Sequence, residues 1–376
     1  MRPLVYDRAV SAVGSLLESI EWESCALEPL PDAELLAYLR RELGMVPRTA
    51  IYMTPCPWIV RSLAGLNQYN ALLAHLEIPL AELIALTVSE DNSCRYCFGM
   101  QRFVLRMQGV PEPRIRALAD SLFAAELDPR SRSALEFARR FSRANPLLAA
   151  ADAEPLRRAG WSEPAIREIA FVAAAHVYYN RVATLPALPP QPMENLPDRW
   201  WMRVFAGAIG RRIRRSQRPG APESLPPDAR AGPFEALVAS LDGLPAARAL
   251  RGILDEAFAS AVLPRRTKGL IFAVVAHALG CPRSEAEAAR LLAADGLGAP
   301  ERDEILAHLA SPRLDATEAA LLPLARDTIH YRPAQIQRRA RALRDTIGVE
   351  PFVEFVGVAS LANAVCRLAS LTAEMS

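Results

Sequence analysis

The chain has 376 residues, of which 51% are hydrophobic, and its formal net charge is +2. This length favours two domains over one, and the hydrophobic fraction allows each to bury a core. The near balance of charges argues against a protein that binds nucleic acid through bulk positive charge. Many Ala, Leu and Arg residues, with few aromatic residues and few alternating patterns, predict an all-α fold.

The N-terminal stretch MRPLVYDRAVSAVGSLLESIEW is charged at its start. It has neither the apolar core nor the small-residue cleavage site of a secretory signal. We find no run of about 18 apolar residues, so no membrane span is expected. The sequence therefore predicts a cytoplasmic protein, in which paired cysteines are more typical of redox or metal chemistry than of structural disulfides.

Helical periodicity, interrupted by glycine and proline, runs through the first half of the chain. Asp32 is expected to cap the second helix. The predicted helices cover residues 5–20, 32–44, 57–75, 79–91, 94–108, 112–123, 129–143, 152–159 and 163–183.

The stretch EDNSCRYCFGMQRF, residues 90–103, contains two cysteines three positions apart, Cys94 and Cys97. We expect a helix that begins at Cys94, capped by Ser93 or Asn92. Residues i and i+3 share a helix face and lie close enough for a disulfide. A thiol in the first helical turn feels the positive end of the helix dipole, which lowers its pKa and favours the reactive thiolate.

Metal binding and simple packing are the alternatives to a redox role for the cysteine pair. A zinc site needs two further ligands, whereas the other four cysteines are isolated and the five histidines show no paired spacing. In a packing role, the cysteines are two small buried residues. His75 and His176 are most simply histidines of a helix face or of the core, and Tyr96 is either a packing residue or a donor to the site.

A proline-rich segment between Pro186 and Pro233 reads as a linker. Within it, DRWWMRVFAGAIGRRIRRSQ, residues 198–217, predicts one basic amphipathic helix. Such a helix either lies at a membrane surface or, as we favour, packs its tryptophans on a domain and leaves its arginines in water.

The sequence also matches itself, without a gap, at a shift of 187 residues over roughly 120 positions. One constant register through so many turns predicts two copies of one fold, which we expect to form a pseudo-twofold unit within the chain. Examples of matched positions are Gly65 with Gly252, Val88 with Val275, Cys94 with Cys281, Gly109 with Gly296, and Pro146 with Pro333.

The second copy lacks the polar residues of the first. At this shift Glu82 matches Gly269, Cys97 matches Ser284 and Gln101 matches Ala288. We therefore predict a domain with the CxxC motif over 1–188, a linker over 189–233, and a degenerate domain over 234–376.

The stretch IPLAELIALTVSEDNSCRYCFGMQRFVLRMQGV resembles the carboxymuconolactone decarboxylase and AhpD-like alkylhydroperoxidase superfamily. Its redox branch carries a glutamate twelve residues before a CxxC motif, which Glu82, Cys94 and Cys97 match in type and spacing. The resemblance covers about 40–185 and, more faintly through the repeat, 235–375. It implies two tandem AhpD-like helical domains, and the two-copy architecture is similar to that of the sestrins.

The resemblance also implies roles for these residues. Cys97 would be the peroxidatic cysteine that attacks the peroxide, Cys94 would resolve the product as a disulfide, and Glu82 would belong to a proton relay. No bound cofactor is implied; an external thiol protein or small dithiol would reduce the enzyme.

The sequence departs from the family at one position. The histidine expected four residues after the second cysteine is Gln101, which forms hydrogen bonds but carries no proton near neutral pH. A thiol-dependent peroxide reductase or disulfide oxidoreductase is the function we favour. The alternatives are a non-catalytic or sensory protein of this fold and, less favoured, a non-redox enzyme of the decarboxylase type.

Overall fold

The computed structural model describes residues 20–120, 127–191 and 221–371, and every regular element within these ranges is a helix, as predicted. The first half contains α2 (Ala33–Leu43), α3 (Ala50–Met53), α4 (Pro57–Asn67), α5 (Tyr69–Leu72), α6 (Ile78–Asp91), α7 (Arg95–Met107), α8 (Glu112–Asp120), α9 (Pro129–Arg143), η1 (Ala150–Ala153), α10 (Glu154–Arg158) and α11 (Glu163–Thr184).

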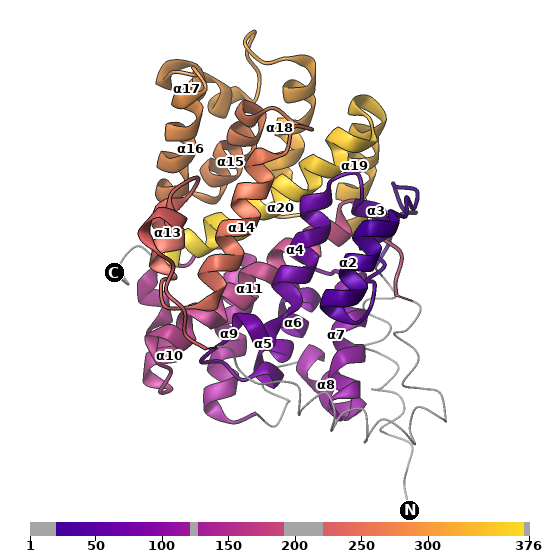
Figure 1. The fold of residues 1–376 in the computed structure, drawn as a ribbon, viewed down its shortest axis with the longest axis vertical. Helices are drawn as coiled ribbons and strands as arrows, with labels where there is room; N and C mark the ends of the chain where they lie inside the picture. The colour runs from indigo at the N-terminus through magenta and orange to yellow at the C-terminus, as the bar shows by residue number, and fades with distance from the viewer. Residues whose placement is uncertain (1–19, 121–126, 192–220, 372–376) are drawn as a thin grey trace, which may run out of the picture.

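The second half is also helical. It contains η3 (Pro227–Arg230), α13 (Glu235–Ser240), α14 (Pro245–Ala259), α15 (Arg265–Leu279), α16 (Pro282–Ala294), α17 (Ala299–His308), α18 (Ala316–Asp327), α19 (Pro333–Ile347) and α20 (Val349–Leu371). α15 to α19 occupy the upper part of Figure 1, whereas α13, α14 and α20 lie at the height of α2, α3 and α4 of the first half.

Local sequence explains where the helices begin and end. The Asp32 carboxylate accepts a hydrogen bond from the Leu35 backbone amide, so the predicted cap of α2 is confirmed. The predicted helix over 57–75 is wrong in one respect, because it divides into α4 and α5. Gln68 lies between them with φ −89° and ψ 66°, outside the helical region, and this breaks the ladder of hydrogen bonds.

Several predictions fall outside the described residues. These are most of the helix over 5–20, the end of the helix over 112–123, the basic amphipathic helix over 198–217 and much of the linker. The described parts of the linker are 189–191 and 221–233.

Two long apolar helices lie in the middle of the molecule. α11 packs against α20, α6 and α9, and α20 packs against α11 and α15 (Figure 1). α20 is long and apolar enough to cross a membrane, contrary to our expectation, but its most apolar window is entirely buried by protein. α20 is therefore explained as a core helix.

The helix bounds repeat at the shift found in the sequence. Moving α6, α7 and α8 by 187 residues makes them begin at 265, 282 and 299, which are the first residues of α15, α16 and α17. Asp128 and Asp315, one shift apart, are both N-caps whose side chains accept a backbone amide. The duplication itself stays a prediction.

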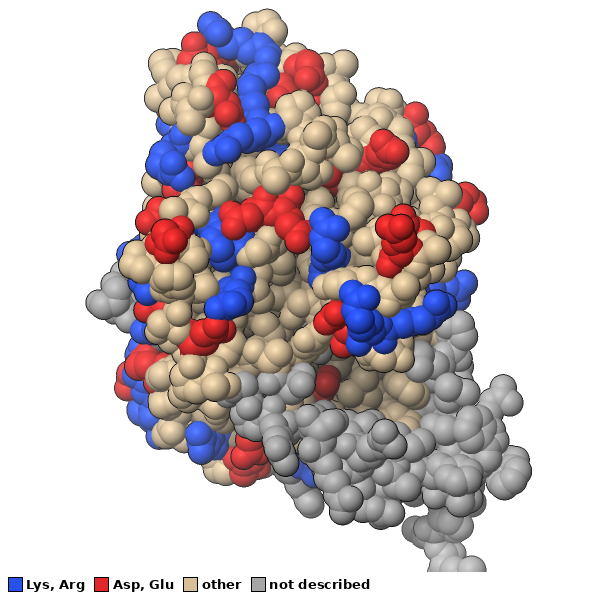
Figure 2. Space-filling model, viewed as in Figure 1, with Lys and Arg blue, Asp and Glu red and all other residues tan. Residues whose placement is uncertain are grey.

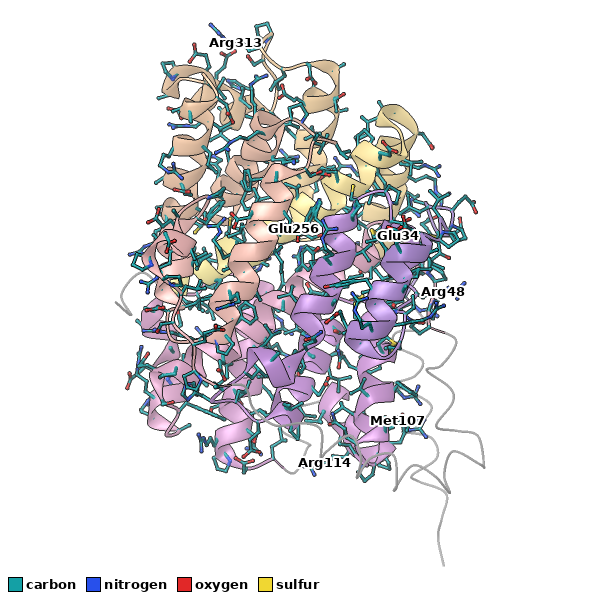
Figure 3. All side chains as sticks on the ribbon, viewed as in Figure 1. Glu34, Arg48, Met107, Arg114, Glu256 and Arg313 are labelled. Carbon is teal, nitrogen blue, oxygen red and sulfur yellow. The ribbon has the colours of Figure 1, made fainter. Side chains whose placement is uncertain are left out.

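A buried ion pair of the second half also contacts the first half. Lys268 Nζ lies 2.9 Å from Glu354 Oε1, and both side chains are fully buried. The carboxylate also accepts hydrogen bonds from Ser260 and from the Cys56 thiol, which belongs to the first half. An exposed pair, Arg61–Glu256 at 2.7 Å, joins α4 to α14 at the surface, where Figure 3 labels Glu256. Elsewhere on this face, acidic and basic side chains are interspersed (Figure 2).

We predict that Gly357→Ala destabilises the fold. A Cβ atom on Gly357 of α20 would lie 2.5 Å from Ile59 Cδ1 and 2.7 Å from Trp58 Cζ2 of α4. Such overpacking is expected to lower the free energy of unfolding by about 1–3 kcal/mol. The control is Gly65→Ala within α4, where no atom from outside the surrounding helix backbone lies within 4 Å of the added Cβ. That change should raise stability by about 0.5–1 kcal/mol, because alanine is the better helix former. Urea unfolding of both variants measures whether the free energy of unfolding falls in Gly357→Ala and rises in Gly65→Ala.

Candidate functional site

The cysteine motif lies at a tight connection between α6 and α7. Asn92 is the C-cap of α6, and Ser93 has φ of 52°, in the left-handed region. Cys94 is the N-cap of α7, and its sulfur accepts a hydrogen bond from the Cys97 amide at 3.3 Å. The predicted start of the helix at Cys94 is therefore shifted by one residue, and the cap is Cys94 itself, because left-handed Ser93 cannot lead directly into a helix.

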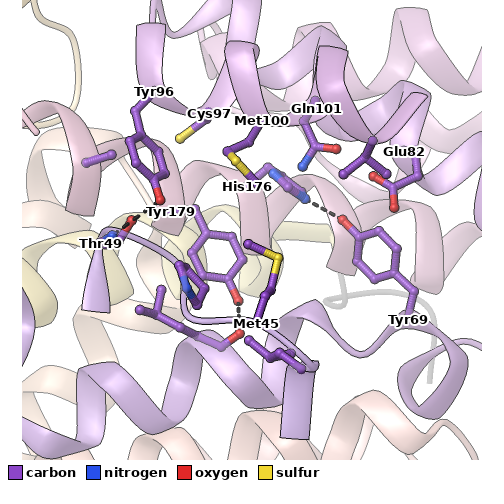
Figure 4. A pocket seen from close by; sticks show the side chains of 15 residues that line it. Met45, Thr49, Tyr69, Glu82, Tyr96, Cys97, Met100, Gln101, His176 and Tyr179 are labelled. Atoms are coloured by element: carbon purple, nitrogen blue, oxygen red, sulfur yellow. Dashed lines mark hydrogen bonds between the residues drawn. The ribbon is translucent and has the colours of Figure 1, made fainter. Parts of the chain in front are cut away.

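A cavity of about 230 Å³ opens beside this turn (Figure 4). Four of the five predicted site residues line it, namely Glu82, Tyr96, Cys97 and Gln101, whereas Cys94 does not. The other lining residues are Leu43, Met45, Pro47, Thr49, Leu63, Tyr69, Met100, Val104, His176, Tyr179 and Ala183. The lining is largely apolar and includes neither lysine nor arginine.

Burial dominates the chemistry of Cys97. Its side chain is only 6% exposed, and Cys94 is fully buried. Desolvation raises the pKa of the Cys97 thiol well above its usual value, and the neighbouring Cys94 sulfur raises it further. Our expectation of a lowered pKa is therefore wrong for the resting protein. The helix N-terminus favours the thiolate by less than the loss of water disfavours it.

Glu82 lies on α6 with its carboxyl group in the same cavity. Desolvation raises the pKa of Glu82 to about 8, and no neighbouring charge opposes this shift. At pH 7 the carboxyl group is therefore mostly neutral and is able to donate a proton. In Figure 4 it lies beside Gln101, whose buried Oε1 has no hydrogen-bond partner among the described residues.

The hydroxyl of Tyr96 is held by the surrounding chain. It accepts hydrogen bonds from the Thr49 amide at 3.3 Å and from Gln191 Nε2 at 2.5 Å. Burial raises the pKa of Tyr96 to about 12. Tyr96 thus stays neutral and ties the cavity to Gln191 at the start of the linker. It is the acceptor in both hydrogen bonds, so its role as a donor to the site stays a prediction.

Sequence reasoning missed three residues that the fold brings to the cavity: Tyr69, His176 and Tyr179. Tyr69 hydrogen-bonds to His176 Nε2, and desolvation lowers the pKa of His176 to about 3, so its imidazole is neutral. A usable signal is present in AAHVYYN, where His176 and Tyr179 share a helix face amid small apolar residues. His176 is buried, as expected, but it is also a cavity residue.

The second half of the chain contacts the turn that precedes the cysteine motif. The Tyr331 hydroxyl, in the loop after α18, donates to the Asn92 carbonyl at 3.4 Å. The buried Arg181 guanidinium lies 5.4 Å from the centre of the Tyr331 ring and donates to the carbonyls of Thr328 and Ile329. The loop after α18 is therefore fixed against the turn that presents Cys94.

Across residues 20–120, 127–191 and 221–371, no three His, Cys, Asp or Glu side chains gather in a way that suits a metal ion. The polar groups that face the cavity suit proton transfer and hydrogen bonding.

Comparison with known proteins finds no matching family model and no matching curated protein. Among solved structures, an uncharacterized peroxidase-related protein from Ralstonia eutropha JMP134, described as an alkylhydroperoxidase AhpD core, is 25% identical. The similarity covers 44% of this chain and 90% of that one, with a TM-score of 0.40.

A peroxidase-related protein from Silicibacter sp. TM1040 is 29% identical over 44% of this chain and 89% of that one, with a TM-score of 0.39. The debrominase Bmp8 is 21% identical over 48% of this chain and 96% of that one, also with a TM-score of 0.39. All three similarities are partial and low in TM-score, so the chemistry of the cavity is inferred from its own residues.

We predict that Glu82 makes stability depend on pH. An acid whose pKa rises on folding, here from 4.5 to about 8, stabilises the folded state most below pH 4.5, and that contribution is lost as pH rises through 8. At 1.36 kcal/mol per pKa unit, the loss is at most about 5 kcal/mol. Urea unfolding between pH 5 and 9 should therefore show a fall for the wild type that is absent in Glu82→Gln. If the free energy of unfolding depends on pH in the same way in both proteins, the raised pKa of Glu82 would be contradicted.

Proposed function

We propose that this protein is a thiol-dependent hydroperoxide reductase or disulfide oxidoreductase that uses the Cys94–Cys97 dithiol. The observation that carries the proposal is the joint presence of Cys97, Glu82 and Gln101 around one buried cavity beside the cysteine turn. A nucleophile, a neutral acid and a hydrogen-bonding amide then face the same bound molecule.

In the first step, Cys97 sulfur attacks the distal oxygen of ROOH and the O–O bond breaks. Cys97 gives up its thiol proton and becomes a sulfenic acid, while the alkoxide takes up one proton and leaves as ROH, so protons balance. Glu82 is suited to supply that proton, because its raised pKa keeps it protonated at neutral pH. The free Oε1 of Gln101 is suited to accept the hydroperoxide O–H and orient the substrate.

In the second step, Cys94 sulfur attacks the sulfenic acid, a disulfide forms and water leaves. The N-cap position of Cys94, 3.3 Å from the Cys97 amide, keeps its sulfur near the first turn of α7. An external dithiol then reduces the disulfide. Since Cys94 is fully buried and Cys97 faces the cavity, the reductant would attack the Cys97 sulfur and release Cys94.

A second candidate is a non-catalytic or sensory protein that binds a small apolar molecule in this cavity. The observation that favours it is the raised pKa of Cys97, since a redox nucleophile is more often found with a lowered one. The two candidates differ in the fate of the thiols when a peroxide is added.

We predict that brief exposure to cumene hydroperoxide converts both motif thiols to a Cys94–Cys97 disulfide. Thiol trapping and mass spectrometry should find this product in the wild type and none in Cys97→Ser. Cys94→Ser should stop at a sulfenic acid on Cys97, detected with dimedone. Cys25→Ser serves as the matched control, because that half-buried thiol lies outside the cavity and should change nothing. Motif thiols that oxidise no faster than Cys25 would favour the binding protein.

A further inference from the structure

The cavity contains one side chain able to replace the proton-carrying function that Gln101 lacks. His176, near the middle of α11, contributes an imidazole that is 2% exposed and lines the cavity together with Cys97. Its Nε2 is hydrogen-bonded to the Tyr69 hydroxyl, while its Nδ1 has no partner among the described residues. One ring nitrogen is thus held in place, and the other is buried without a partner.

A packing role alone does not account for this nitrogen. The His176 ring lies between two aromatic rings, with centroid distances of 6.3 Å to Tyr69 and 5.6 Å to Tyr179. A phenylalanine would fill such a space without burying a polar atom. Leaving a buried polar atom unpaired costs about 1–3 kcal/mol, so an unpaired Nδ1 beside a cavity points to a partner that enters the cavity.

Tyr69 is hydrogen-bonded to His176 and lies within electrostatic range of Glu82, the acid of the site. Its hydroxyl is bonded to the imidazole, and the pKa of Tyr69 is raised mainly by burial and further by the charge that Glu82 can carry. Figure 4 shows Tyr69, His176 and Glu82 around one side of the cavity, with Cys97 further along the same wall. The titratable groups that line this cavity are thus Tyr69, Glu82, Tyr96, Cys97, His176 and Tyr179.

We propose that His176 is the base that accepts the Cys97 thiol proton, and that Tyr69 passes a proton on to Glu82. The inference rests on the proposed peroxide reductase function, because it names the proton path of that reaction. His176 is the catalytic residue, and Tyr69 carries protons between it and the acid.

The proton movements balance. His176 Nδ1 receives the Cys97 proton, directly or through one water molecule, and Nε2 releases its own proton to the Tyr69 oxygen. Tyr69 gives its proton to Glu82, and Glu82 gives its proton to the departing alkoxide, so ROH leaves as a neutral molecule. The imidazole then returns to its first tautomer by exchange with water.

This path suits a desolvated cavity. Tyr69, Glu82 and His176 are each neutral before and after the transfer, so none is left carrying a charge that burial would disfavour. The raised pKa of Cys97 is then compatible with reactivity, since the thiolate forms only as its proton moves toward His176.

The test compares four variants with the wild type in stopped-flow oxidation by cumene hydroperoxide, with disulfide formation as the readout. His176→Gln should lower the rate about 10²-fold, the lower end of what a positioned base contributes. Adding Gln101→His to His176→Gln should raise the rate of disulfide formation at least tenfold above that of His176→Gln, because it provides an imidazole on α7. Tyr69→Phe keeps the ring but removes the hydroxyl, and should slow the reaction less than His176→Gln does. His75→Gln is the matched control on an exposed histidine.

The pH profile separates a base from a structural residue. Below the pKa of Cys97, the oxidation rate of His176→Gln should rise about tenfold per pH unit, because the thiolate must then form without a base. The oxidation rate of the wild type should rise less steeply with pH. A wild-type rate and slope in His176→Gln would overturn the inference and leave the peroxide reductase intact. If the wild type forms no disulfide, both the role of His176 and the proposed peroxide reductase function would be overturned. If His176→Gln fails to fold, an unchanged rate in Tyr69→Phe would count against the relay.

Discussion

The removal of water from one cavity is the constraint on which the chemistry of this protein depends. Cys97, Glu82 and His176 all face the same largely apolar space, and each is pushed by burial toward its neutral form. A thiol, a carboxylic acid and an imidazole that are all neutral at pH 7 would be an unusual starting state for the redox function proposed above. Under the proposed function, reactivity would have to come from coupled proton transfer when a peroxide enters, because the resting cavity disfavours a free thiolate.

The long core helix α11 lines that cavity and, packed against α20, joins the two halves. α11 carries His176 and Tyr179 on its cavity side, and Arg181 of the same helix reaches the loop after α18 in the second half. That loop supplies Tyr331, which supports the carbonyl of Asn92 just before the cysteine motif. The second half therefore has a physical connection to the dithiol even though it lacks Cys97 and Glu82 at the matching positions.

Much of the fold was predictable because its signals are local. Asp32 caps its helix through a hydrogen bond three residues away, and the periodicity of apolar residues set most helix bounds to within a few residues. The break at Gln68 and the left-handed Ser93 were not predictable, because each depends on how neighbouring helices pack. In the same way, spacing alone predicted that Glu82, Cys97 and Gln101 would lie on connected helices, but it could not identify Tyr69 and His176 as their neighbours.

The sequence by itself determined the helical class, the 187-residue register, the cysteine pair and the presence of Gln101 four residues after Cys97, since all of these are properties of residue type and spacing. Only the tertiary structure decided how those residues titrate. The helix N-terminus predicts a lowered pKa for Cys97, whereas burial on all sides raises it. Desolvation depends on side chains from α4, α5, α6, α7 and α11 together, and residues so distant along the chain become neighbours only when the fold closes around them.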